Sequence, residues 1–476
     1  MNCTEHELIR ALAEVVGQAR VIADGPDLEH FGSDRCRGGW PVRPMGIVFP
    51  GSVAEIQEVV RICARHRVAI VPSGGRTGLA GGATATAGEV VLSLARMHRI
   101  LEVNEAARTL RCEAGATLES VQEAARARGL LYPVDFSSRG SAQIGGSVAT
   151  NAGGVRVIRH GLTRDHVAGM TVVIATGDRL ELGRGLVKDN TGYDLRQLFI
   201  GSEGTLGVIA EVVVKLVTPP AGAVVALCGL ASDDAVLELF TRLRRSPLVL
   251  GAFECFDHGC VERVLEHRGS DAAGPLAEPS PRYALVEVEV AAPGEAAVEA
   301  ALASLTTCLE EAAIAGEIED ASFASTPAQA RALWSLREDI SEALHRHRPH
   351  KADVALPIPR VAAFLGDLRR AAAADLAGLE VLCFGHVGDG NIHVNTLCPP
   401  TMDHSQFLDV SRRFDRRLYQ LVEDHGGSIS AEHGIGLLKR EHLPHSRSAA
   451  ELSVMRAIKR ALDPEDLFNP GKLFPA

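Results

Sequence analysis

The sequence predicts an α+β protein with more than one domain, and three observations support this. The chain has 476 residues, enough for about three domains of ordinary size. Short Val/Ile-rich strand patterns alternate with helical patterns over the first 217 residues, and a break follows at Thr218-Pro-Pro-Ala-Gly222. From there to residue 430, Ala-rich helical segments such as 295–315 are interleaved with strand patterns such as 283–290, which is typical of an α+β domain. We therefore expect domains over 1–217 and 218–430, followed by a C-terminal segment over 431–476.

A helix and a strand precede the first glycine-rich segment. Ser52-Val-Ala-Glu55 is a capping box, which predicts a helix beginning just after Ser52. Residues 67–71 then read as a strand that leads into the segment Pro72-Ser-Gly-Gly-Arg-Thr-Gly-Leu-Ala-Gly-Gly82. Glycines allow successive backbone N–H groups to converge on an anion such as a pyrophosphate, and the hydroxyls of Ser73 and Thr77 could add donors.

A second glycine-rich segment, Gln143 to Gly154, shares this character, and a third motif with several glycines runs from Lys188 to Gly207. Neither of the first two segments has the G-x-G-x-x-G spacing that opens a Rossmann helix, and the chain contains no G-x-x-x-x-G-K-[ST] motif. A Rossmann NAD site and a Walker ATP site are therefore disfavoured. The plain alternative is that these segments are structural turns.

Residues of metal-ligating type gather in two segments of the second half. The first reads Phe384-Gly-His-Val-Gly-Asp-Gly-Asn-Ile-His-Val-Asn395, and the second, residues 428–434, contains Glu432 and His433. His386 and His393 would face opposite sides of an unbroken strand, but the Gly-Asp-Gly between them is turn chemistry that can bring both imidazoles to one site. Two imidazoles and the Glu432 carboxylate form a three-ligand set typical of catalytic metals, most of all zinc, with manganese, iron or cobalt as alternatives. His433 could then act as a general base. The alternative is an ordinary hairpin with unrelated histidines.

A predicted helix and the strand beyond it carry further polar residues. Thr326-Pro-Ala-Gln329 is a capping box, so a helix should begin near residue 327 and run through Glu342, with Arg337 and Ser341 on one face. Taken alone, Arg337 would be expected to be exposed and to pair with Glu338 or Asp339. Asn395 lies two residues after His393 and hence on the same strand face, where it could contact a substrate.

Composition excludes several classes of protein. The formal net charge of -11 argues against sequence-independent nucleic-acid binding. The ten cysteines contain no C-x-x-C pair, which fits a reducing compartment and disfavours a disulfide framework or an iron-sulfur cluster. The N-terminus lacks a signal-peptide pattern and no apolar run is long enough to span a membrane. We expect a cytoplasmic protein without a transmembrane segment.

Taken together and in order, these motifs resemble the FAD-dependent D-2-hydroxyacid dehydrogenases of the vanillyl-alcohol oxidase / p-cresol methylhydroxylase superfamily, most of all the enzymes that oxidise D-2-hydroxyglutarate. The match covers nearly the whole chain. The resemblance implies a two-subdomain FAD-binding domain of the p-cresol methylhydroxylase type over 1–217 and an α+β substrate domain with an antiparallel sheet over 218–430. It also implies that the segment 431–476 packs back on the FAD domain.

The resemblance implies non-covalent FAD, since no matched His or Cys lies in the glycine-rich segments. This chain departs from the family at Arg76 and Ala142, where small residues and Cys are commoner, and at Ser147, which is often Asn. The residues implied to bind FAD are Pro72, Ser73, Gly74, Gly75, Thr77, Gly78, Gly145, Gly146, Ala149, Thr150, Asn151, Gly153, Gly154, Ser202, Glu203, Gly207, Ile209 and Asn469.

The resemblance also implies the reaction. The family's metal ligands match His386, His393 and Glu432, and its catalytic base matches His433. The base would take the proton of the substrate's 2-hydroxyl while hydride leaves C2 for flavin N5, giving a 2-oxo acid. The family's substrate-binding positions match Arg337, Ser341 and Lys351, with Asn395 as a further contact. Binding of a distal carboxylate there would favour oxidation of D-2-hydroxyglutarate to 2-oxoglutarate.

Three alternatives stay open. The first is a D-lactate, D-malate or glycolate dehydrogenase of the same family, and the second is a non-catalytic flavin subunit that relays electrons. The third is an oxidase that uses oxygen. The resemblance further implies a homodimer and an electron acceptor that is either an electron-transfer flavoprotein or a quinone.

Overall fold

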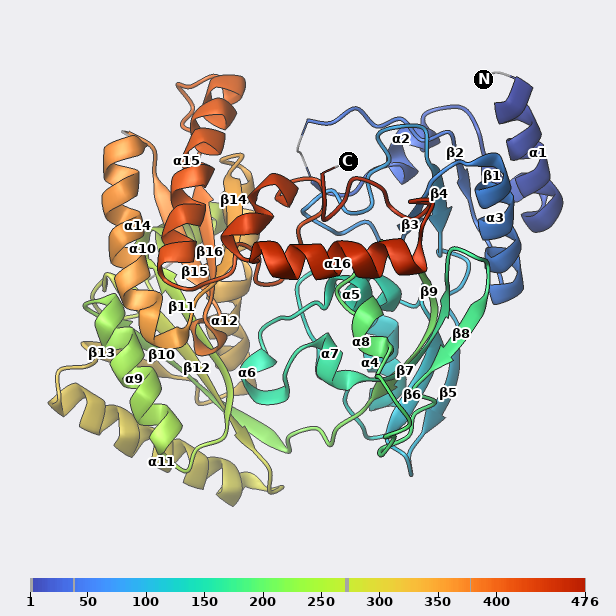
Figure 1. Ribbon diagram of the computed structural model, residues 1–476. Coiled ribbons are helices and arrows are strands. Elements are labelled where there is room, and N and C mark those ends of the chain that lie inside the picture. Colours follow the sequence, from blue (N-terminus) through green and yellow to red (C-terminus); the bar gives the residue numbers. More distant parts are fainter. Residues whose placement is uncertain (1–2, 37–38, 270–273, 377, 476) are drawn as a thin grey trace. The chain divides into compact units, whose positions relative to one another are not determined.

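The computed structural model describes residues 3–36, 39–269, 274–376 and 378–475, which divide into two compact units (Figure 1). Unit 1 takes its residues from 1–154, 161–219 and 432–476, and unit 2 from 155–160 and 220–431. The predicted boundaries after residues 217 and 430 thus lie close to the observed ones after residues 219 and 431. The short excursion of 155–160 into unit 2 was not predicted.

Unit 1 contains a four-stranded sheet in the order β1-β2-β4-β3, with β1 at Val21–Ile22, β2 at Gly46–Val48, β4 at Val90–Ser93 and β3 at Ile70–Ser73. Helix α3 (Val53–His66) begins as predicted, because the Ser52 side chain accepts a hydrogen bond from the Glu55 N–H at 3.2 Å. Strand β3 begins three residues later than predicted. The reason is that Arg67 ends α3 in the left-handed conformation, with φ of 53°, so the chain is not yet extended there. β3 then leads directly into the first glycine-rich segment.

A second sheet of unit 1 is antiparallel and has the order β5-β6-β9-β7-β8, with β5 at Ile100–Asn104, β6 at Thr109–Glu113, β9 at Val208–Lys215, β7 at Val167–Val173 and β8 at Arg179–Leu182. One hydrophobic core contains residues of both sheets together with α3, α4 (Leu118–Arg126) and α5 (Ile144–Thr150). The glycine-rich segments at the end of β3 and around α5 are therefore held by one core. The other short helices of unit 1 are η1 (Gln18–Arg20), α2 (Asp27–Phe31), α7 (Thr163–His166) and α8 (Arg196–Phe199), and α1 (Cys3–Val16) packs on α3.

The C-terminal segment belongs to unit 1. It contains η4 (Arg440–His445) and α16 (Ala449–Leu462), and α16 ends just before Pro464, as expected for a helix stopped by proline. Phe468 forms a parallel bridge with Ile70 of β3, and the Asn469 N–H donates to the Ile70 carbonyl at 2.7 Å. The end of the chain thus packs on the strand that leads into the first glycine-rich segment.

Unit 2 is built on a seven-stranded sheet in the order β13-β10-β12-β11-β15-β16-β14, in which every neighbouring pair is antiparallel. Its strands are β10 (Gly222–Leu230), β11 (Leu250–Asp257), β12 (Arg282–Val290), β13 (Asp320–Phe323), β14 (His350–Ala355), β15 (Val381–Gly385) and β16 (Asn391–Thr396). The expected antiparallel sheet is therefore present. Together with unit 1 it gives the expected α+β fold.

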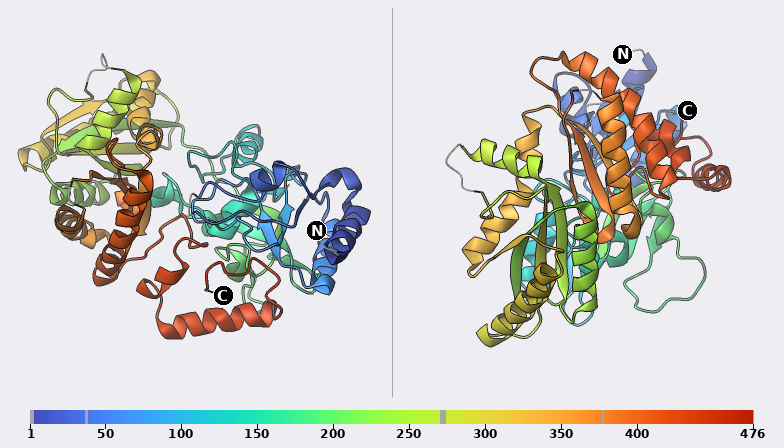
Figure 2. Two further views of the ribbon diagram at one scale, coloured as in Figure 1. Left: turned by 90° about the horizontal axis from the view of Figure 1, so that it is seen from above. Right: turned by 90° about the vertical axis from the view of Figure 1, so that its left-hand side faces the viewer.

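Helices lie on both faces of the unit 2 sheet (Figure 2). On one face, α10 (His258–Arg268), α12 (Pro327–Glu338) and α13 (Ile340–His345) share a core with Phe256, Leu285 and Phe384 of the sheet. On the other face, Phe240 of α9 packs on Phe253 of β11, with ring centroids 5.0 Å apart. The remaining helices of this unit are α9 (Asp233–Arg245), α11 (Glu295–Ile314), α14 (Val361–Asp375), α15 (His404–Asp424), η2 (Ile358–Arg360) and η3 (Val387–Asp389).

The segment 155–160 joins unit 2 through ion pairs with strand β12. It contains α6 (Val157–His160), and Arg156 pairs with Glu287 at 2.8 Å while Arg159 pairs with Glu289 at 2.9 Å. Burial alone would raise the pKa of the Glu289 carboxyl, but the hydrogen bonds and charges of His160 and Arg159 outweigh burial and lower this pKa to about 2. These ion pairs explain why residues 155–160 belong to unit 2, which was not predicted.

The helix predicted from residue 327 is shorter than expected. It begins at Pro327, where the Thr326 hydroxyl accepts from the Gln329 N–H at 3.2 Å, but it ends at Glu338, and α13 starts at Ile340. At Asp339 the backbone tightens, because its N–H is shared between the carbonyls of Ser335 and Arg337. A single helix through Glu342 is therefore wrong. As a result Arg337 is buried, whereas Ser341 is exposed on the next helix.

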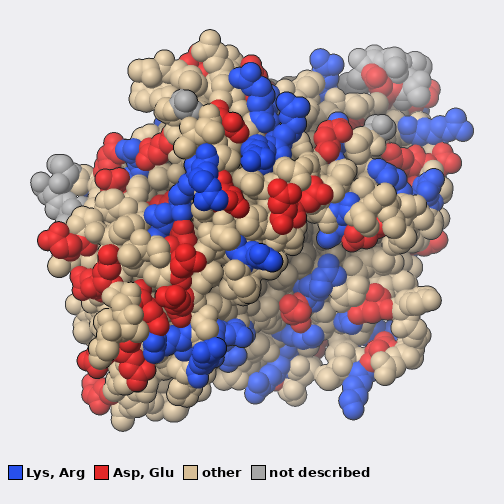
Figure 3. Space-filling model, turned by 60° about the vertical axis from the view of Figure 1, so that its left-hand side comes forward, with Lys and Arg blue, Asp and Glu red and all other residues tan. Residues whose placement is uncertain are grey.

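Two features of composition reappear in the structure. All but one of the nine described cysteines are buried, and all nine are free thiols, as expected for core residues. Acidic and basic side chains are interspersed over the face drawn in Figure 3.

Within the described ranges, no helix has the length and apolar character needed to cross a membrane.

Candidate active site

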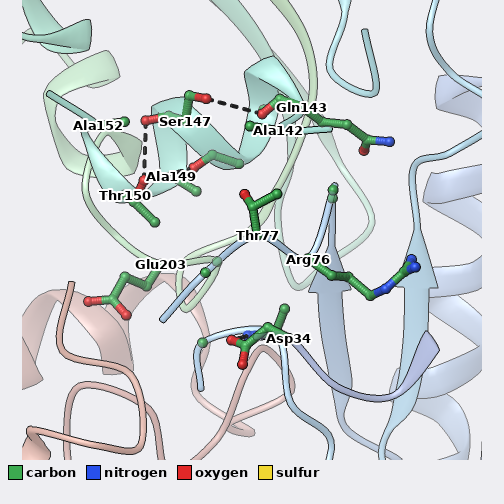
Figure 4. A pocket seen from close by; sticks show the side chains of 18 of the residues that line it. Asp34, Arg76, Thr77, Ala142, Gln143, Ser147, Ala149, Thr150, Ala152 and Glu203 are labelled. Carbon is green, nitrogen blue, oxygen red and sulfur yellow. Dashed lines mark hydrogen bonds between the residues drawn. The ribbon is translucent and has the colours of Figure 1, made fainter. Parts of the chain in front are cut away.

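A cavity of about 270 Å³ lies in unit 1, between the glycine-rich segments (Figure 4). Its lining includes most of the residues expected to bind FAD: Pro72, Ser73, Gly74, Gly75, Thr77, Gly78, Gly145, Gly146, Ala149, Thr150, Gly153, Glu203, Gly207 and Ile209. Four others, Asn151, Gly154, Ser202 and Asn469, are not in the lining. The three glycine-rich segments, which lie far apart in the sequence, thus meet around one cavity.

Close backbone packing explains two of the glycines in the lining. A Cβ on Gly75 would lie 1.9 Å from the Ser141 carbonyl oxygen, and a Cβ on Gly145 would lie 2.6 Å from the Cβ of Ala114. At Gly146, by contrast, an added Cβ would meet no atom within 4 Å, so the backbone there borders open space. The absent side chains therefore allow the segments to pack together and leave bare backbone at the cavity.

Two buried polar atoms at this cavity, Ser73 Oγ and Gln143 Oε1, have no hydrogen-bond partner among the described residues. Buried polar groups are normally paired, so two unpaired ones in one cavity wall indicate a polar ligand. Bare backbone together with hydroxyl and amide groups suits the pyrophosphate and the hydrogen-bonding edge of a flavin dinucleotide. The residues present therefore fit FAD.

Arg76, at which this chain differs from the family pattern, does not block the cavity with its side chain. Arg76 has φ of 55°, and its guanidinium lies 4.5 Å above the Phe31 ring and 3.1 Å from His30 Nε2. Figure 4 shows its side chain directed away from Thr77 and the residues of α5. Burial lowers the pKa of the Arg76 guanidinium. Ala142 and Ser147 also line the cavity, and the Ser147 hydroxyl donates to the Gln143 carbonyl at 3.3 Å.

Sequence reasoning missed Asp34, which also lines this cavity. Its carboxylate accepts hydrogen bonds from the N–H of Cys36 at 2.9 Å and of Ala83 at 3.3 Å. Burial raises the pKa of the Asp34 carboxyl, and these N–H groups act in the opposite direction. Asp34 is far in sequence from the glycine-rich segments, so no local pattern could have marked it. Other unpredicted lining residues are Leu79, Phe136, Ser137, Ser138 and Gln143.

The C-terminal segment contributes Glu432 and His433 to the lining of the same cavity. His433 Nε2 lies 3.7 Å from Glu432 Oε1. Asn469, which is outside the lining, donates from Nδ2 to the carbonyls of Gly82 at 2.8 Å and Glu203 at 2.7 Å. Asn469 therefore links two cavity segments to each other.

In unit 2, the predicted chain reversal brings His386 and His393 together. Strands β15 and β16 are antiparallel neighbours, and the turn between them passes through η3 and Gly390, whose φ is 85°. A Cβ on Gly390 would lie 2.1 Å from the Leu356 carbonyl oxygen, so only glycine fits there. The two imidazole centroids are 5.5 Å apart.

A buried carboxylate that sequence reasoning missed, Glu254 of β11, lies beside His386. Glu254 Oε1 is 2.7 Å from His386 Nδ1, and Oε2 accepts from Arg337 Nε at 2.8 Å. Burial alone would raise the pKa of the Glu254 carboxyl, but the charges and hydrogen bonds of His386 and Arg337 outweigh burial and lower this pKa. The alternative of an exposed Arg337 paired with Glu338 or Asp339 is wrong. Glu254 is 132 residues from His386, so only the folded chain reveals the pair.

Strands β14 and β16 carry a row of polar residues on one face of the sheet. Lys351 lies opposite Asn395, and Asp353 lies opposite His393, and such cross-strand partners point to the same side. Asp353 Oδ1 is 3.4 Å from His393 Nδ1. The Asn395 side-chain nitrogen is buried and has no hydrogen-bond partner in the part of the chain that the structure describes. Burial lowers the pKa of the Lys351 ammonium, while Glu342 acts in the opposite direction.

Asp353 also fixes the backbone that leads to Glu432. Its Oδ2 accepts a hydrogen bond from the Ala431 N–H at 3.1 Å, and Glu432 is the next residue along the chain. Asp353 and His393 of unit 2 are both groups that could hold a metal ion, as are Glu432 and His433 of unit 1. Unit 2 thus ends at a residue that is hydrogen-bonded to the polar row on β14 and β16.

Two family models match the N-terminal and the C-terminal part of the chain. Residues 44–183 match the family described as FAD binding domain, and residues 219–473 match the C-terminal domain of FAD linked oxidases. The chain is 47% identical to D-2-hydroxyglutarate dehydrogenase from Xanthomonas citri pv. viticola, over 98% of this chain and 96% of that protein. It is 42% identical to the protein of that name from Stutzerimonas stutzeri, over 99% of this chain and 100% of that protein.

Solved structures with low sequence identity share the fold. A structure of p-cresol methylhydroxylase with substrate bound has a TM-score of 0.79 and 16% identity, covering 100% of this chain and 98% of that one. An alkyldihydroxyacetonephosphate synthase has a TM-score of 0.73 and 17% identity, covering 98% of this chain and 84% of that one. The fold is therefore of the p-cresol methylhydroxylase type. The chain belongs to the FAD-linked oxidases, and within them to the FAD-dependent D-2-hydroxyacid dehydrogenases of the vanillyl-alcohol oxidase / p-cresol methylhydroxylase superfamily.

Proposed function

We propose that this protein oxidises D-2-hydroxyglutarate to 2-oxoglutarate, with non-covalent FAD as the electron acceptor and a divalent metal at the substrate. The names of the similar proteins support the substrate. The single observation that carries the proposal is the polar row of unit 2, where Lys351, Asn395 and His393 share one face of the sheet. A dicarboxylate needs two anion-binding points, and this row offers a cation at one end and a metal-ligating imidazole at the other.

The distal carboxylate is assigned to Lys351 and Asn395. The Asn395 amide nitrogen is a buried donor that none of the described residues pairs with, and a carboxylate oxygen would satisfy it. Lys351, directly across the strand pair, supplies the opposite charge. Arg337 donates to Glu254 only through Nε, and its terminal N–H groups, which make no hydrogen bond to the described residues, suit a second carboxylate contact. Ser341 is retained as a weaker candidate because it is exposed on α13.

The metal is assigned to His386, His393 and Glu432. The donor set of two imidazole nitrogens and one carboxylate oxygen fits zinc best. Glu254 accepts a hydrogen from His386 Nδ1, which selects Nε2 as the metal-binding nitrogen. When bound, the cation would lower the proton affinity of the substrate's 2-hydroxyl group. The hydrogen bond between Ala431 and Asp353 restrains the backbone immediately before Glu432.

The role of proton acceptor is assigned to His433, which lines the FAD cavity of unit 1. As a general base it takes the 2-hydroxyl proton. The hydrogen on C2 leaves with both electrons of its bond, and a 2-oxo acid results. When bound, FAD supplies the two-electron acceptor for this step at N5.

Two further assignments rest on the family resemblance alone. The electron acceptor that reoxidises the flavin is proposed to be an electron-transfer flavoprotein or a quinone, and the working form is proposed to be a homodimer. The cytoplasmic location expected from the sequence stays a prediction. One observation favours a second candidate function. Because Arg337 is partly occupied by Glu254, a smaller substrate such as D-lactate could be the better one.

Anaerobic visible spectra test the proposal directly. The purified yellow protein is mixed with D-2-hydroxyglutarate, and D-lactate, D-malate and L-2-hydroxyglutarate are tested in parallel. Bleaching of the flavin band by D-2-hydroxyglutarate, with little effect of the others, is the expected result. Bleaching by D-lactate alone would overturn the substrate, and no bleaching of a metal-replete sample by any of the four would overturn the catalytic assignment.

A further inference from the structure

We infer that Glu203 is a positioning residue: its carboxylate fixes the backbone that follows His433 and thereby sets the place of this base at the FAD cavity. This inference rests on the proposed role of His433 and deepens it. Family resemblance implied that Glu203 binds the cofactor. Its side-chain contacts point to a different task.

The Glu203 carboxylate accepts hydrogen bonds from two successive backbone N–H groups. Oε1 accepts from Ile435 at 2.7 Å, and Oε2 accepts from Gly436 at 2.8 Å. Ile435 is only two residues after His433. Both oxygens of a carboxylate that borders the cavity are therefore committed to the chain that carries the base.

Steric contacts make this arrangement specific. Gly434 has φ of 80°, and a Cβ on it would lie 3.0 Å from Glu203 Cδ, so the glycine next to His433 lets the carboxylate approach the backbone. Gly436 has φ of 48°, and its added Cβ would lie 2.2 Å from the Ala80 carbonyl oxygen. The His-Gly-Ile-Gly sequence is thus shaped to fit between Glu203 and the first glycine-rich segment.

A second set of bonds holds the next residues to that glycine-rich segment. The Ala80 carbonyl accepts from the N–H groups of Leu437 at 2.9 Å and Leu438 at 3.1 Å. The backbone after His433 is therefore fixed at four consecutive residues. The first two of these attachments depend on one side chain, that of Glu203.

Glu203 itself is held rigidly. Its side chain is buried, its φ is 52°, and its own N–H donates to the Ala149 carbonyl of α5 at 2.8 Å. A non-glycine residue rarely adopts this backbone conformation, so the position retains a side chain that the local geometry disfavours. Burial raises the pKa of the Glu203 carboxyl, whereas the two N–H donors and the Lys439 charge act in the opposite direction. Rigid anchoring to α5 makes Glu203 a fixed link between the cavity wall and the base.

The test compares Glu203→Gln with a matched control, Glu113→Gln. Glu113 is a buried glutamate of unit 1 that accepts a backbone N–H from Arg99 at 2.8 Å, but it does not line the cavity. A glutamine at 203 can accept from one N–H but turns its own NH₂ toward the other. Each holoenzyme is assayed for FAD content and visible spectrum, and then by anaerobic stopped flow for the saturating rate of flavin reduction and the apparent substrate Kd. His433→Asn is assayed in parallel.

We expect E203Q to keep its FAD, spectrum and apparent substrate Kd while its saturating reduction rate falls by about 10- to 100-fold, because a base displaced by about 1 Å transfers protons poorly. E113Q should match the parent enzyme. Loss of FAD from E203Q, or an unchanged reduction rate in E203Q beside a slow H433N, would overturn the inference and leave the proposed function standing. An H433N variant as fast as the parent would instead overturn the role of His433.

A measurement on the parent enzyme covers the case in which E203Q does not fold. Hydrogen exchange resolved to single residues should show slow exchange of the Ile435 and Gly436 amides in the holoenzyme, since both are bonded to Glu203. Exchange of both at the rate of an unstructured peptide would overturn the inference.

Discussion

The buried pair of Arg337 and Glu254 allows a stabilising role to be separated from a substrate-binding role. If Arg337 only bound substrate, its loss would leave the stability of the substrate-free protein unchanged. In the structure, however, Arg337 Nε donates to Glu254 at 2.8 Å, and the two side chains are 8% and 1% exposed. The guanidinium also lies 4.7 Å above the Phe384 ring. We therefore expect Arg337→Met to destabilise unit 2 even without substrate.

The expected loss of stability follows from the Glu254 charge that stays buried after the substitution. Removing one partner of a buried ion pair costs about 3–5 kcal/mol, because the other charge stays buried without compensation. His386 remains as a partner of Glu254 in the Arg337→Met variant, so we expect the lower end, about 3 kcal/mol. For a unit of this size that corresponds to a fall in melting temperature of about 6–12 °C. Adding Glu254→Gln removes the unpaired charge, so the double variant should recover most of the loss.

The assay follows one tryptophan. The chain has two, Trp40 in unit 1 and Trp334 in unit 2, and Trp334 donates from Nε1 to Glu287 at 2.8 Å. In a Trp40→Phe background, thermal unfolding followed by tryptophan fluorescence reports on unit 2 alone, which matters because two units need not unfold in one step. An Arg337→Met variant that melts like its parent, yet loses affinity for D-2-hydroxyglutarate, would refute the stabilising role.

Four other predictions concern the charge of Lys351, its titration, the metal and the behaviour of the protein in acid. Lys351→Ala should lower kcat/KM for D-2-hydroxyglutarate by about 10- to 150-fold, the loss of one charge-assisted hydrogen bond, and leave that for D-lactate nearly unchanged; equal losses would contradict the distal-carboxylate assignment. Because burial lowers the pKa of Lys351, KM for D-2-hydroxyglutarate should rise with pH sooner than an ordinary lysine would cause, and Lys351→Arg should abolish this rise. Chelation should leave flavin absorbance intact but slow flavin reduction by more than about 100-fold until zinc, manganese or cobalt is restored; undiminished reduction in metal-free protein would exclude a metal role. The lowered pKa of Glu289 means that its ion pairs stabilise the protein above the unfolded pKa near about 4.3 and are lost as the pH falls toward about 2. The protection of the 156–160 amides from exchange, relative to the intrinsic rate at each pH, should fall in that window, and unchanged protection would contradict the assignment.

Local signals predicted local structure well. The capping boxes at Ser52 and Thr326 marked the true starts of α3 and α12, because the capping hydrogen bonds involve residues three apart. The errors occurred where backbone geometry had no residue signature. Arg67 takes a left-handed conformation without being glycine or asparagine, and the helix break at Asp339 lies within a helix-favouring sequence. Strand order was out of reach, since β14 pairs with β16 and not with its neighbour in sequence.

The candidate site was predictable to the same extent. His386 and His393 could be placed together because they are seven positions apart and the segment between them contains two glycines. The partners that orient them could not be predicted, since Glu254 lies on β11, which pairs with β15 but is 132 residues from His386 in sequence, and Asp353 lies across the strand pair from His393. The sequence therefore indicated the proposed ligands His386 and His393, but not the buried carboxylates beside them.

Two buried carboxylates follow one physical logic, although Glu254 was missed and Glu203 was predicted only as a cofactor contact. In unit 2 the buried Glu254 holds the Nδ1 side of His386, and in unit 1 the buried Glu203 holds the backbone after His433. A buried carboxylate is costly unless every oxygen is paired, so each accepts two charged or backbone donors, and this requirement allows only a narrow range of geometries. The division of the chain falls between Ala431 and Glu432, so the proposed ligand His386 and the proposed base His433 are oriented by separate cores. Variants of Glu254 should therefore change metal affinity without displacing FAD, whereas variants of Glu203 should slow flavin reduction and leave the two imidazole ligands His386 and His393 in place. A metal titration of both variants, read beside their flavin spectra, separates the two effects: metal affinity should fall more in the Glu254 variant than in E203Q, and an equal fall would show that the two cores do not act independently.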